Sequence, residues 1–106
     1  MEETVVVAVL KVKAGKADEA VAGFTPVIEQ THGESGCITY ALHRDKADPD
    51  TIVLIERWRS QEDLEAHFTQ PHMAEMGSLA AELLEEPPRI IFCSAVPAGD
   101  AAKGVL

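Results

Sequence analysis

Positive charge, long apolar runs and paired cysteines are scarce or missing in this chain. Of its 106 residues, 9 are lysine or arginine and 18 are aspartate or glutamate, which gives a formal net charge of −9. An acidic surface repels phosphate backbones and anionic lipid, so neither nucleic acid nor a membrane is expected as a partner. No apolar run approaches the roughly 20 residues of a spanning helix. The first residues lack the basic region of a signal peptide, so we expect a cytoplasmic protein.

The cysteines and histidines show no metal-binding spacing. Cys37 and Cys93 are far apart and form no CxxC motif, so both are expected to be buried free thiols. His67 and His72 are five residues apart across Pro71, whereas two ligands on one helix face are four apart. We therefore expect no metal site.

What is present indicates one ordinary globular domain. Hydrophobic residues make up 46% and charged residues 25% of the chain, which is enough for a single core. We assign the domain to residues 1–97 and a loose tail to residues 98–106.

The spacing of apolar residues predicts the order strand, helix, strand, strand, helix, strand. Pro26 falls inside the first helix and should kink or interrupt it, because proline removes a backbone donor. Gln70-Pro71 should divide the second helix in two. The expected strands cover residues 4–12, 36–44, 52–58 and 89–96, and the expected helices cover residues 16–33 and 60–85.

This order is the split βαβ pattern of a ferredoxin-like α+β domain with an antiparallel sheet. Right-handed crossovers place the first and third strands in the centre, and these two are the most continuously apolar. Helices can cover only one face of such a sheet. The other face would expose an apolar patch, so we predict a homodimer in which two open sheet faces meet.

Residues 52–76 are the only stretch in which polar side chains that could take part in catalysis are expected beside a cavity. Glu56 and Trp58 lie two apart on a strand and so share a face. Ser60 caps the helix that carries His67. If the Glu56 carboxylate is buried, it needs a hydrogen-bond or ion-pair partner, and Arg44 and His67 are the candidates. Glu56 either faces the helices, where it would orient His67, or faces the dimer interface, where it would form a structural ion pair.

Three stretches of the chain are similar to the antibiotic biosynthesis monooxygenase family, and the similarity extends over residues 4–96. Those stretches are Glu34 to Tyr40 (ESGCITY), Glu56 to Trp58 (ERW), and Ser60 to His67 followed by Pro71-His72. The resemblance implies a dimeric ferredoxin-like fold and places the chain with cofactor-free oxygenases of quinols and aromatic polyketides. The superfamily also contains an isomerase and haem-degrading enzymes.

Departures from the family pattern narrow these options. The haem-degrading branch uses an asparagine on the first strand and a histidine in the second helix. This chain contains no asparagine, and Met76-Gly77-Ser78 occupies the region of that histidine. The remaining pattern is that of quinol oxygenases and isomerases, in which a histidine at the position of His67 lines the pocket.

The sequence thus leads to a monooxygenase of a small aromatic or quinol substrate that needs no cofactor. Imidazole titrates near neutral pH, so His67 is the candidate base, with Glu56 as the second catalytic candidate. An isomerase of a small carbonyl compound would use the same base. A dimeric module that binds a small apolar ligand without catalysis stays open, and a filled cavity would favour it. The candidate substrate-binding residues are Trp58, Tyr40, Phe68, His72, Phe24 and Met76.

Overall fold

A computed structural model describes residues 2–106, and its elements follow the predicted order with the second helix divided in two. Pro71 stands at the first position of the later helix, where its missing N–H costs nothing. The elements are β1 (Thr4–Lys11), α1 (Ala17–His32), β2 (Cys37–Arg44), β3 (Thr51–Trp58), α2 (Gln61–Phe68), α3 (Pro71–Leu83) and β4 (Arg89–Ser94).

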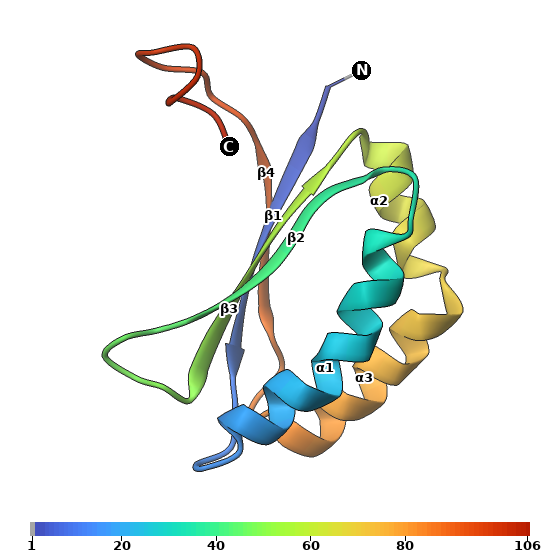
Figure 1. The fold of residues 1–106 in the computed structure, drawn as a ribbon, viewed down its shortest axis with the longest axis vertical. Helices are drawn as coiled ribbons and strands as arrows, with labels where there is room; N and C mark the ends of the chain where they lie inside the picture. The colour runs from blue at the N-terminus through green and yellow to red at the C-terminus, as the bar shows by residue number, and fades with distance from the viewer. Residues whose placement is uncertain (1) are drawn as a thin grey trace.

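The four strands form one antiparallel sheet in the order β2-β3-β1-β4. The first and third strands are central, as the sequence predicted, and the helices cover one side of the sheet (Figure 1). The ferredoxin-like α+β fold is therefore confirmed.

Alternation along the central strands separates two faces. Val6 and Leu54 face the helices and are buried against residues such as Phe24 of α1. Val7 pairs with Ile55 on one side and Ile91 on the other, and all three point to the opposite face, where they stay partly exposed. The core lies between the sheet and the helices, and no helix covers the other face among residues 2–106, where the C-terminal segment borders only the end near Val5 and Arg57 (Figure 1).

Pro26 does not interrupt α1, so that expectation was wrong. The helix runs continuously from Ala17 to His32. Pro26 is exposed, and so is Ala22, whose carbonyl loses its helical partner and can bond water instead.

The beginning of β2 is irregular, which moves one cysteine to the other face. Cys37 pairs with Trp58 and Thr39 with Arg57, so the register shifts between the two pairs. In a regular strand Cys37 would lie on the same face as Thr39. The irregularity instead turns Cys37 toward the core, against which it packs. Cys37 and Cys93 are free thiols on opposite edge strands, as predicted, although both are only partly buried.

The segment after β4 forms turns but no helix or strand, so the proposed boundary of the tail stays a prediction. Among residues 2–106, none of the helices has the length and apolar character needed to cross a bilayer.

A close approach at Gly36 fixes α2 against the start of β2. A Cβ atom at position 36 would overlap the Cβ and Cγ atoms of Asp63, in the first turn of α2. Asp63 is held in place by Ser60 and by Arg59, so it cannot move freely.

We expect Gly36→Ala to lower the free energy of unfolding by about 1–3 kcal/mol, the usual cost of overpacking. Gly77→Ala is the matched control, because a Cβ there meets nothing within 4 Å in the middle of α3. It should stabilise the protein by about 0.5–1 kcal/mol. Urea unfolding followed by circular dichroism measures both, and equal effects would contradict the packing argument.

Candidate functional site

Local sequence sets the position of His67. Ser60 accepts the backbone N–H of Asp63 at 3.2 Å and starts α2 directly after β3. The helix ends one residue after His67, at Phe68. This short helix places the imidazole over the end of β3, where it is completely buried.

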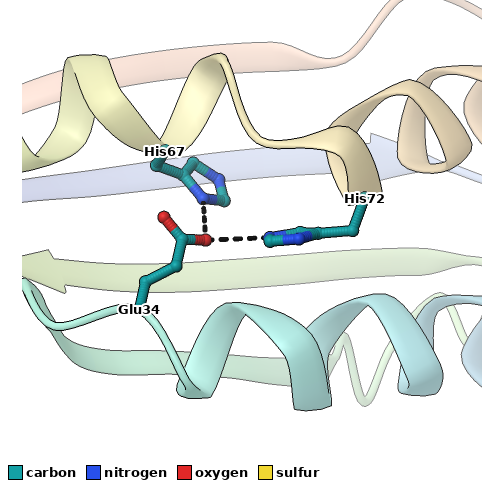
Figure 2. Close-up of side chains that lie close together, drawn as sticks. All are labelled: Glu34, His67 and His72. Carbon is teal, nitrogen blue, oxygen red and sulfur yellow. Dashed lines mark hydrogen bonds and ion pairs between the residues drawn. The ribbon is translucent and has the colours of Figure 1, made fainter.

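A carboxylate from a different part of the chain holds this imidazole. His67 Nδ1 lies 2.8 Å from Glu34 Oε2, and His72 Nε2 lies 2.9 Å from the same oxygen (Figure 2). A carboxylate can only accept, so both ring nitrogens donate their protons to it. Glu34 lies between α1 and β2, and His72 is the second residue of α3. Three segments therefore meet at one oxygen atom.

Aromatic rings enclose the His67 imidazole. The indole of Trp58 lies nearest, with 4.6 Å between ring centroids. The rings of Tyr40 and Phe68 follow at 5.4 and 5.5 Å, and the His72 ring at 6.1 Å. Such surroundings exclude water and offer the second ring nitrogen no polar group.

His67 Nε2 is buried and has no hydrogen-bond partner among residues 2–106. Burial lowers the pKa of His67 below its ordinary value, and the hydrogen bond and charge of Glu34 oppose this shift in part. The ring is therefore neutral near pH 7, with its proton on Nδ1. This tautomer leaves a free lone pair on Nε2.

A small apolar cavity adjoins the imidazole between sheet and helices. Its volume is about 90 Å³. Six of the eight site residues predicted from the sequence line it, namely His67, Glu56, Tyr40, Phe68, Phe24 and Met76. Pro88 and Ile90 are among the lining residues that the sequence did not single out.

The other two predicted residues do not line this cavity. Trp58 is fully buried and packs against His67. His72 borders a separate, more open hollow together with Glu34, because its ring turns toward that carboxylate.

Glu56 faces the helices, which resolves one alternative left by the sequence. It is 6% exposed and accepts the indole N–H of Trp58 at 2.9 Å. Neither expected partner is used, since Arg44 bonds Asp18 and His67 bonds Glu34. Burial raises the pKa of Glu56 to about 7, an effect that the Trp58 hydrogen bond opposes and the charge of Glu34 increases.

Burial also raises the pKa values of two neighbouring groups. It shifts the pKa of Cys37 to about 11, with contributions from the charges of Glu34 and Glu56. The pKa of Tyr40 rises well above its ordinary value for the same reasons. The thiol is therefore a poor nucleophile, and the phenol keeps its proton as a possible donor to a ligand.

Sequence reasoning missed Glu34 and misjudged the two histidines. Glu34 is 33 residues from His67 and 38 from His72, so no local spacing indicated it. The sequence argument considered only the spacing of His67 and His72 along one helix face, and it did not consider a carboxylate shared across the break at Pro71. The chain turns between α2 and α3, which brings His67 and His72 to the same carboxylate. The only available signal was the resemblance, since Glu34 opens one of its three stretches.

Glu56 predicts a distinct pH dependence of stability. The carboxyl has a pKa near 4.3 in unfolded chains and about 7 in the folded protein. Between these values the unfolded chain releases the proton first, so the free energy of unfolding falls as pH rises. The loss is nearly complete about one unit above pH 7 and amounts to roughly 4 kcal/mol at most.

Glu56→Gln keeps an acceptor for Trp58 and should remove this fall, making the variant the more stable protein at pH 8. Urea unfolding between pH 4.5 and 8 measures it. Glu29→Gln, an exposed glutamate of α1, is the control and should follow the wild type. His67 has the opposite effect on the pH dependence. Because its pKa is lowered in the folded protein, acidification lowers the free energy of unfolding. Identical profiles for wild type and Glu56→Gln would contradict the assignment.

Known proteins are similar to much of this chain. The family model described as "Antibiotic biosynthesis monooxygenase" matches residues 4–78. An uncharacterized protein of Synechocystis sp. is 33% identical over 81 residues, which cover 76% of this chain. The probable quinol monooxygenase YgiN of Escherichia coli (strain K12) is 36% identical over 77 residues, with 64% of this chain and 74% of YgiN covered.

The fold comparison agrees with the sequence comparison. A crystal structure of a conserved protein from Methanosarcina mazei Go1 has a TM-score of 0.83 and 29% identity, with 89% of this chain and 93% of that chain covered. The match spans only 55% of the Synechocystis protein's length. The family match over residues 4–78 includes β1 to α2 with Glu34, Glu56 and His67. The chain belongs to the antibiotic biosynthesis monooxygenase family.

Proposed function

We propose that this protein is a cofactor-independent monooxygenase of a quinol or another small dihydroxy-aromatic compound, with His67 as the general base. The observation that carries the proposal is the buried imidazole, whose Nδ1 is held by Glu34 while Nε2 stays unpartnered beside an apolar cavity. The similarity to a probable quinol monooxygenase supports the substrate class.

The chemistry follows from these atoms. Nε2 takes the proton of a substrate hydroxyl, and the resulting imidazolium is stabilised by the Glu34 carboxylate. The electron-rich anion then transfers one electron to dioxygen. The resulting substrate radical and superoxide combine to form a bond between carbon and oxygen. A quinol plus dioxygen gives a hydroxyquinone plus water. One oxygen atom enters the ring, the other leaves as water, and the substrate supplies every electron.

The residues that line the cavity exclude water and supply hydrogen-bond donors. Tyr40 keeps its phenolic proton because its pKa is raised, and Glu56 is partly protonated near pH 7. Each can donate to an oxygen on which negative charge develops. Trp58 lies behind both Glu56 and His67 and fixes their positions.

Substrate entry requires a side chain to move. The cavity of about 90 Å³ is smaller than the roughly 150 Å³ that holds one benzene ring in a known protein. Phe68 lines the cavity yet is 48% exposed, and its ring packs edge-on against Phe92 at 6.3 Å. Rotation of Phe68 toward solvent would enlarge the cavity without disturbing the buried core.

An isomerase of a small carbonyl compound is the second candidate. The observation that favours it is the presence of two proton carriers in one cavity. His67 can remove a proton next to a carbonyl group, while Glu56, with a pKa of about 7, can protonate the carbonyl oxygen. Unlike the monooxygenase, the isomerase would need no dioxygen.

Oxygen consumption with a panel of quinols tests the proposal. His67→Ala should lower the rate by about 10²–10⁴-fold, the usual contribution of a general base. His43→Ala, an exposed histidine of β2, is the matched control and should retain the wild-type rate. Conversion without dioxygen would favour the isomerase. Equal rates for both variants would exclude His67 as base. Binding of a quinol without any conversion would favour a non-catalytic binding module.

We further propose that two chains associate through their open sheet faces. Val7, Ile55 and Ile91 form the centre of an apolar patch opposite the helices, and the register places them side by side. A patch of this kind is unfavourable in water, and a second copy would cover it.

Val7→Asp introduces a charge at the centre of this patch and should shift a dimer to monomer. Ala74→Asp, an exposed position of α3, is the control and should leave the mass unchanged. Sedimentation analysis measures the mass, and circular dichroism verifies folding. A wild-type protein that sediments as a monomer would refute the proposal.

A further inference from the structure

The cluster of Glu34, His67 and His72 has the composition of a metal centre. The three donor atoms, Glu34 Oε2, His67 Nδ1 and His72 Nε2, all lie within 4.8 Å of one another (Figure 2). They come from the α1–β2 loop, the end of α2 and the start of α3. The side chains of His67, His72 and Glu34 are 1%, 8% and 12% exposed, so their positions are constrained by packing.

We infer that this cluster binds a late first-row divalent metal ion, with Zn²⁺ as the probe, and that the ion takes the place of the two N–H protons shared with Glu34. Two imidazoles and one carboxylate are a common set of zinc ligands. Magnesium and calcium prefer all-oxygen sites and would be excluded.

Zinc binding requires all three donors to adjust, and the two ring nitrogens, which lie within 4.8 Å of each other, must reach the spacing of tetrahedral ligands. Zinc bonds of roughly 2.0–2.2 Å hold tetrahedral donors about 3.3 Å apart. The two N···O distances are now 2.8 and 2.9 Å, so the carboxylate must retreat by about half an ångström. Glu34 lies in a loop, where such a shift is possible.

An access route exists on one side of the cluster. Glu34 and His72 border an open hollow of about 410 Å³, which is separate from the apolar cavity. Gly33 and Gly36 also line it, and water that enters this hollow can supply the fourth ligand. The net charge of −9 favours the approach of a cation.

Metal binding would change the tautomer of His67. In the hydrogen-bonded form the proton lies on Nδ1, and Nε2 carries the lone pair. An ion on Nδ1 leaves a neutral ring only if the proton moves to Nε2. His72 changes in the reverse sense, from a proton on Nε2 to one on Nδ1.

This consequence deepens the proposed function and rests on it. A protonated Nε2 cannot accept a proton from a substrate, so the metal-bound form would be inactive and the metal-free form active. Binding of the ion itself does not depend on any activity. The two ideas can therefore fail separately.

Equilibrium dialysis against ZnCl₂, with metal analysis of the protein, tests the site. We expect one zinc ion per chain in the wild type and in His43→Ala, and no retention of Mg²⁺. Glu34→Ala and His72→Ala each remove a ligand and should bind zinc at least 10–100-fold more weakly, the range known for loss of supporting groups alone. Zinc binding that these variants do not change, or none in the wild type, would overturn the proposal.

Nitrogen-15 NMR of the wild-type histidines provides a readout that requires no variant to fold. Without zinc, the His67 signals should report a proton on Nδ1, and with zinc a proton on Nε2. His43 serves as the internal control and should not change. Saturating zinc without a tautomer change at His67 would overturn the proposal even if oxygen consumption proved that the enzyme is a monooxygenase.

Discussion

The bond between the Glu34 carboxylate and the Nδ1–H of His67 is the interaction on which the site depends. A fully buried imidazole among aromatic rings has no other partner for that proton, and an unsatisfied buried donor is costly. The bond fixes the ring and its tautomer together. It also leaves Nε2 unpaired beside the cavity. The tight packing of Gly36 on Asp63 holds the loop and α2 at the distance that this bond needs.

Burial acts in opposite directions on the two titratable groups of the cavity. It lowers the pKa of His67 and raises that of Glu56, because in each case it disfavours the charged form. Both groups are thereby shifted toward neutrality near pH 7, one as a proton acceptor and the other as a proton donor. A site with few fixed charges suits an apolar ligand. It also makes the single carboxylate of Glu34 decisive, since that carboxylate can be shared by two imidazoles or by a metal ion.

The sheet divides the molecule into a face that builds the core and the cavity and a face that stays partly exposed. Residues of β1 and β3 that point toward the helices build the core and the cavity, and alternate residues such as Val7 and Ile55 form the bare patch. One strand sequence therefore serves both purposes through its two-residue period. A change of register would exchange the two faces, so pairing of the central strands is a condition for the site as well as for the fold.

The sequence by itself determined the order of elements, the central position of β1 and β3, the division of the second helix at Pro71, and part of the cavity wall. These features follow from the spacing of apolar residues and prolines over short stretches of the chain, which the sequence shows directly. Only the tertiary structure revealed that Glu34 is the partner of His67, that Trp58 is the partner of Glu56, and that an irregularity turns Cys37 toward the core. Contacts across 33 and 38 residues depend on how a loop and two helices pack. No local pattern records that arrangement, because it arises only when the sheet and the helices close around one buried ring.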